Sequence, residues 1–169
     1  MLIEELKSKL PKREQSINSF FASCSERKSY INAESSDIAL HLEKAKHDLS
    51  RAIKEFEDGC FDWTVIKAYY SIHYAGNALL IKRQGVFSKS HVCLIIALKR
   101  LNLISDDFYG ELREIHSKFS DFTAFEITYS LRRIGQYDVV KWKSIGREDA
   151  DALISFAKKF IQFVESEVV

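Results

Sequence analysis

The residues best suited to chemistry lie in one basic segment, residues 131–147. It holds a single carboxylate, Asp138, against five basic side chains: Arg132, Arg133, Lys141, Lys143 and Arg147. Cations that bind phosphates, next to aromatic rings that stack on unpaired bases, are what single-stranded nucleic acid binding uses. The segment therefore predicts an RNA- or nucleotide-binding surface made by Arg132, Arg133, Tyr137, Lys141, Trp142 and Lys143.

A structural interpretation of the same residues stays open. Arg132 and Asp138 could form an ion pair that fixes a loop. Charged loops are commonly just solvated, and Trp142 could anchor this one to the core. Under that interpretation the segment has no ligand.

The histidines are the other candidates for chemistry, because imidazole transfers protons near neutral pH. No two of the five have the H-E-x-x-H or H-x-H spacing of a metal site, so neither a metal nor another cofactor is expected. His73 and His116 are candidate acid–base residues, with Arg132 and Tyr137 as candidate partners. His73 follows Tyr69 and Tyr70 in the chain, and core packing is the more frequent role of such residues.

The composition indicates a single soluble domain. The chain has 169 residues, a net charge of +1, one proline and six glycines. So few breakers favour long helices over a β-sandwich or barrel, and the charge gives no general attraction to nucleic acid or membrane. No apolar run spans a membrane and no signal-peptide core is present, which predicts a cytoplasmic protein.

Cys24, Cys60 and Cys93 form no C-x-x-C pair, so buried, unbonded cysteines are expected.

Apolar residues at steps of three and four predict the helices. One runs from Ser36 to Asp58, and a second from an N-cap at Asp62 to about Gln84, apolar over most of its circumference. A loop over 87–91 leads to a short helix, Ser105 caps another that reaches about Ser130, and the last covers about 147–168. The prediction is an all-α, up-and-down bundle of four main helices over residues 35–169, with short extra helices and an N-terminal helical arm over 1–34.

Several strings resemble the HEPN superfamily of small prokaryotic helical proteins. They are residues 68–80 (AYYSIHYAGNALL), residues 88–91 (SKSH) at the start of the following helix, and residues 42–49 (LEKAKHDL) before them. Residues 131–138 (LRRIGQYD) and 148–160 (EDADALISFAKKF) are similar to the closing part of the same family. The likeness covers roughly residues 36–165.

The resemblance implies a dimer with a site at its cleft. HEPN ribonucleases are metal-independent and use an Arg, four to six intervening residues and a His, which clamp a phosphate and move a proton. Here Arg132 is followed after four residues by Tyr137, a form found in some branches of the family. A tyrosine pKa of about 10 makes a poor proton shuttle at neutral pH, so the nuclease motif is degenerate.

Three functions remain open. The first is a homodimeric HEPN protein that binds RNA or a nucleotide in its cleft, alongside a nucleotidyltransferase-like partner in a toxin–antitoxin or defence setting. The second is an active ribonuclease in which His73, His91 or His116 replaces the motif histidine. The third is a purely structural interaction module.

Overall fold

The computed structural model describes residues 10–123 and 143–169. Over these ranges the chain is helical apart from two three-residue strands and the connecting turns. The body is made by four long helices: α3 (Ser36–Glu57), α4 (Phe61–Gln84), α6 (Asp106–Thr123) and α8 (Arg147–Val168). The predicted all-α bundle of four main helices is confirmed.

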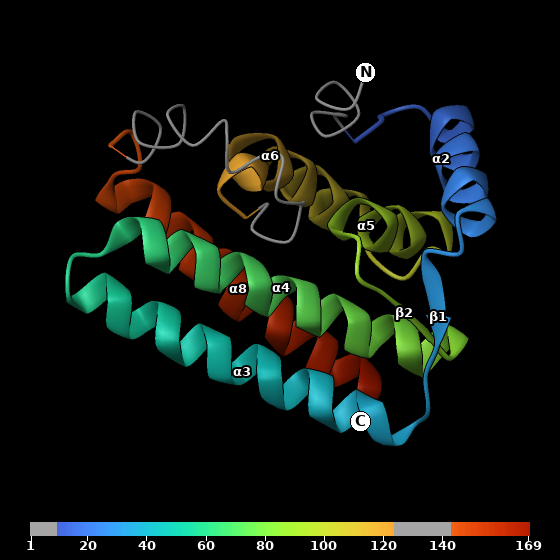
Figure 1. Cartoon of the computed structure of the whole chain (residues 1–169), viewed down its shortest axis with the longest axis horizontal. Coiled ribbons are helices and arrows are strands. Elements are labelled where there is room, and N and C mark those ends of the chain that lie inside the picture. Colours follow the sequence, from blue (N-terminus) through green and yellow to red (C-terminus); the bar gives the residue numbers. More distant parts are fainter. Residues whose placement is uncertain (1–9, 124–142) are drawn as a thin grey trace.

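The α4 helix lies at the centre of the bundle. It contacts α3 and α8 as well as α6 and the shorter α5 (His91–Arg100), and Figure 1 shows it running between these neighbours. Buried residues occur on all sides of α4, as its continuous apolar character predicts. Its small residues Ala68, Ala75, Gly76 and Ala78 are buried inside this one chain.

The helix ends follow local chemistry. Gly85, at φ 67°, ends α4 in the left-handed conformation that glycine adopts without strain. Ser105 Oγ accepts a hydrogen bond of 3.1 Å from the Phe108 amide, so the predicted cap of α6 is confirmed. The predicted N-cap of α4 at Asp62 is wrong. The turn after α3 is short and the helix already begins at Phe61, so Cys60 occupies the N-cap position.

A small antiparallel sheet was not predicted from the sequence. β1 (Tyr30–Asn32) pairs with β2 (Val86–Ser88), in the register Tyr30 to Ser88 and Asn32 to Val86. The sequence predicts a loop over 87–91, which overlaps β2. Three residues are too few to show the alternation of a strand, and the two partners are far apart in the chain.

The N-terminal segment packs on the bundle beside this sheet. Helix α2 (Glu14–Glu26) contacts α5, and its Ile17 side chain is buried. Before α2 in the chain, the Leu10 carbonyl accepts a 2.8 Å hydrogen bond from Arg113 Nε of α6. The helical arm is thus present, while the division into an arm over 1–34 and a bundle over 35–169 stays a prediction.

The expectation of unbonded cysteines is wrong for two of the three. Cys24 of α2 and Cys93 of α5 are buried as expected, but they form a disulfide with Cα atoms 5.8 Å apart. Cys60 is free. The spacing of the pair, 69 residues, carries no sequence signal, because tertiary packing of α2 against α5 is what brings the sulfurs together.

The core follows the predicted helix faces. Phe156 and Phe160 are buried on α8, as the sequence spacing indicates, and their rings stack with centroids 5.8 Å apart. In the part of the chain that the structure describes, every helix is too short or too polar to cross a bilayer.

Candidate functional site

Three histidines from three helices converge beside the central helix. His73 lies on α4, His91 is the first residue of α5, and His116 lies on α6. The rings of His73 and His91 are in contact, with centroids 4.0 Å apart. His116 joins them through Tyr69, whose hydroxyl lies 2.9 Å from His116 Nδ1. We call His73, His91, His116 and Tyr69 the histidine cluster.

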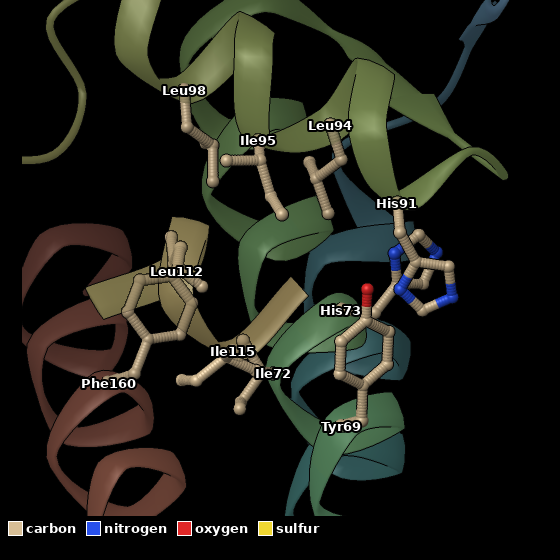
Figure 2. A pocket seen from close by; sticks show the side chains of 10 residues that line it. All are labelled: Tyr69, Ile72, His73, His91, Leu94, Ile95, Leu98, Leu112, Ile115 and Phe160. Atoms are coloured by element: carbon tan, nitrogen blue, oxygen red, sulfur yellow. The ribbon is translucent and has the colours of Figure 1, made fainter. Parts of the chain in front are cut away.

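One face of α4 builds most of this arrangement. Tyr69, His73 and Asn77 follow one another at steps of four residues, so their side chains lie along the same side of the helix. The Tyr69 ring packs on His91 with centroids 4.5 Å apart. Figure 2 shows Tyr69, His73 and His91 turned toward one another at one end of a cavity.

Asn77 fixes the start of α5 against α4. Its Nδ2 donates to the Ser88 carbonyl over 2.9 Å, and its Oδ1 accepts from the Ser88 amide over 2.8 Å. Ser90 Oγ in turn accepts from the Cys93 amide and caps α5. Ser88 and Ser90 are therefore structural: they set where α5 begins and hold His91 on the cluster.

The hydrogen bonds of Asn77 also define the protonation of His73. Asn77 Nδ2 lies 3.2 Å from His73 Nε2, and an amide nitrogen can only donate, so Nε2 accepts and the ring proton sits on Nδ1. His73 Nδ1 is buried and has no hydrogen-bond partner among the residues that the structure describes. The neutral ring therefore fits this position.

Burial keeps the two contacting imidazoles of the cluster, His73 and His91, uncharged. It lowers the pKa of His73 to about 4, with a smaller contribution from His41 on α3. Burial also lowers the pKa of His91 well below its usual value, helped by His73 and His116. A base of such low pKa holds a proton poorly near pH 7, so His73 and His91 are suited to hydrogen bonding rather than to efficient proton shuttling.

The cavity beside the cluster is small and apolar. Its volume is about 20 Å³, which is room for roughly one water molecule. Aliphatic and aromatic side chains of α4, α5, α6 and α8 form the rest of its wall: Ile72, Leu94, Ile95, Leu98, Leu112, Ile115 and Phe160. A nucleotide does not fit in this space within one chain.

Most of the predicted RNA-binding residues lie outside the residues that the structure describes. Arg132, Arg133, Tyr137, Lys141 and Trp142 lie outside the described residues. Lys143 is described and exposed.

Basic and acidic residues at the start of α8 are described. The Arg147 guanidinium sits over the Phe56 ring of α3, 4.8 Å from its centroid, and its side chain remains exposed. Lys118 of α6 hydrogen-bonds the Asp149 carboxylate, and this bond lowers the Asp149 pKa. These contacts fix the first turn of α8 against α3 and α6.

The sequence indicates His73, His91 and His116 as single candidates only. Neither Asn77 nor the role of Tyr69 as the bridge to His116 was predicted. The four-residue spacing of Tyr69, His73 and Asn77 was a usable signal. No grouping of His, Cys, Asp and Glu side chains over 10–123 and 143–169 is able to hold a metal ion.

Comparison with known proteins finds a matching family for most of the chain. A family model described as HEPN domain matches residues 38–167, which is most of the chain. The search of curated proteins finds no match.

Proposed function

The chain belongs to the HEPN family, and from that premise we propose that it binds single-stranded RNA or a nucleotide through its basic segment, residues 131–147. The observation that carries the proposal is the excess of five basic residues over one acidic residue there, with Tyr137 and Trp142 among them. Cations supply phosphate contacts and the aromatic rings supply stacking, so both halves of single-strand recognition are present.

We further propose the setting of this binding. The protein acts in the cytoplasm as a homodimer whose cleft holds the basic segments of both copies. A nucleotidyltransferase-like protein is its partner, in a toxin–antitoxin or defence system. The family and the degenerate motif of Arg132 and Tyr137 support this setting, because a site that keeps the phosphate-binding Arg without the His retains binding better than cleavage.

The described residues at the edge of the segment are compatible with this role. Lys143 is exposed, and Arg147 presents its guanidinium at the surface over Phe56. Both are therefore accessible to a polyanion at the start of α8.

Cleavage by a displaced histidine is the second candidate. The convergence of His73, His91 and His116 favours it, since three imidazoles in one place offer both an acid and a base. Two properties weigh against it: the His73 pKa of about 4 and a cavity with room for one water molecule. We therefore expect weak or no metal-independent cleavage.

The binding proposal is tested with a labelled single-stranded RNA at several salt concentrations. Affinity should fall as salt rises, because bound cations are displaced from the phosphates. Arg132→Ala and Lys141→Ala should each weaken binding and flatten the salt dependence, and Arg132→Ala should have the larger effect because a bidentate clamp is lost. Arg51→Ala and Lys54→Ala, which remove exposed charges from α3, are the matched controls.

If the α3 controls weaken binding as much as the segment variants do, binding is not located in the segment. If none of the proteins binds RNA or a nucleotide, the structural module is the better description.

The two candidates are separated by incubating RNA with the protein in EDTA. The natural protein and Arg132→Ala should leave the RNA intact. Tyr137→His restores an Arg, four residues and a His, so it is the variant expected to gain cleavage. Robust cleavage by the natural protein that is lost in His73→Ala or His116→Ala would instead establish the displaced-histidine ribonuclease.

A further inference from the structure

The disulfide between Cys24 and Cys93 fastens the N-terminal segment to the bundle. Cys24 lies near the C-terminal end of α2 and Cys93 in the first turn of α5. Both are buried, with exposed fractions of 0% and 1%. The bond joins the segment 14–32, which comprises α2 and β1, to the helix that begins with His91 of the histidine cluster.

Two features around the sulfurs stabilise thiolate. Cys93 is the third residue of α5, where the helix end is positive and the Ser90 hydroxyl caps the Cys93 amide. The Arg27 guanidinium lies 3.9 Å from each of the two sulfurs. Positive charge next to a cysteine favours its thiolate, the form that attacks disulfides and leaves from them. A purely structural disulfide needs neither feature.

We propose that Cys24 and Cys93 form a reversible redox latch that holds residues 14–32 on α5 and exchanges with a small thiol–disulfide couple of the glutathione type. This inference is independent of RNA binding. Disulfides of cytoplasmic proteins are characteristically redox-sensing, which fits the proposed location.

Reduction proceeds by two successive thiol–disulfide exchanges. A small-molecule thiolate attacks Cys24 Sγ, the protein disulfide breaks, and Cys93 leaves as the thiolate stabilised by Arg27 and the helix end. A second small thiolate attacks the small-molecule sulfur of the mixed disulfide, so that Cys24 leaves as a thiolate and the small-molecule disulfide is released. Two electrons and two protons pass to the protein, and oxidation is the reverse.

The latch opens only when α2 moves. Both sulfurs are buried, so a reductant reaches them after the α2 end lifts from α5. The Tyr30 hydroxyl, which donates a 2.8 Å hydrogen bond to the Cys93 carbonyl, and the pairing of β1 with β2 oppose this motion. Neither contact involves the sulfurs, so reduction itself breaks neither of them. Reduction should therefore loosen the segment without unfolding the bundle.

The first test measures the redox state of each cysteine. The full chain is equilibrated in buffers of increasing glutathione-to-glutathione-disulfide ratio, quenched with an alkylating reagent and analysed by mass spectrometry. Cys24 and Cys93 should change together in one two-electron transition, and Cys60 should be alkylated throughout. Cys60→Ser should give the same transition.

Two results of this test would overturn the proposal. One is that Cys24 and Cys93 stay alkylated as free thiols in the most oxidising buffer. The other is that they stay bonded in the most reducing buffer, which would make the bond a permanent one.

The second test measures hydrogen exchange of backbone amides. Reduced protein and Cys24→Ser should exchange at least about tenfold faster over 14–32 than oxidised protein, because the opening of this segment is no longer restrained. Exchange in α8 should not change. Equal protection of 14–32 in the oxidised and reduced forms would show that the bond holds nothing in place.

The role of Arg27 is tested through the rate of oxidation. Arg27→Gln should slow the oxidation of reduced protein by glutathione disulfide several-fold, since less thiolate is present. Arg13→Gln removes a guanidinium from just before α2 and is the matched control. Equal rates in the two variants would overturn the activating role of Arg27.

Discussion

The His73 imidazole lies in the protein interior, where burial disfavours its positive charge. Burial, followed by His41, lowers its pKa in the folded protein to about 4, against about 6.5 when the chain unfolds. Below pH 6.5 the unfolded chain takes up a proton that the folded chain does not. The free energy of unfolding should therefore fall as the pH drops from about 6.5 to 4, by about 3 kcal/mol in total from this residue.

Urea unfolding between pH 4 and pH 7 measures this loss. His73→Gln keeps an acceptor for Asn77 but does not titrate, so its stability should depend less on pH. His47→Gln removes an exposed histidine from α3 and is the matched control. A pH dependence of His73→Gln equal to that of the natural protein would contradict the assignment.

Asn77 satisfies both backbone groups of Ser88 in the interior. Asn77→Ala leaves the buried amide and carbonyl without partners and should lower the free energy of unfolding by about 2–4 kcal/mol. Asn18→Ala, at an exposed position of α2, should change it by less than about 0.5 kcal/mol. Denaturant titration compares the two, and a similar small change in both would mean that Asn77 is not needed to hold β2.

At the scale of elements, the contact between α4 and α5 depends on a residue without a side chain. A Cβ atom at Gly76 would lie 3.1 Å from Leu94 Cδ2 and 3.3 Å from Leu98 Cδ1. Gly76→Val forces the two helices apart and should cost about 1–3 kcal/mol of stability. The expected readout is a lower thermal midpoint.

Gly110 is the matched control for this prediction. It lies inside α6, and a Cβ atom there meets nothing within 4 Å. Gly110→Ala should therefore raise stability by up to about 1 kcal/mol through helix propensity alone. A Gly76→Val variant as stable as the natural protein would show that α5 can move away from α4 without loss.

At the scale of the molecule, we expect a symmetric dimer in solution. The expectation rests on the family, because the small residues of α4 that would permit close approach across a two-fold axis are instead buried within one chain. Sedimentation equilibrium measures the mass of the particle. A monomer of 19.5 kDa at high micromolar concentration would contradict the dimer.

The sequence by itself determined the helices and the family. The three- and four-residue steps of Ile38 to Phe56 and of Leu153 to Val164 marked buried faces, because one side of a surface helix must be apolar to pack. Gly85 and Ser105 marked helix ends through local conformation and local hydrogen bonding, which do not depend on distant residues.

Only the tertiary structure decided which distant residues meet. The disulfide of Cys24 with Cys93, the pairing of Tyr30 with Ser88 and the contact of Tyr69 with His116 join residues 47 to 69 positions apart. Such contacts arise where packed helices bring side chains together, and packing leaves no periodic trace at either residue. The histidines were therefore visible as single candidates in the sequence. The low pKa values of His73 and His91 and the union of the three histidines in one buried cluster came from the packing of α4, α5 and α6.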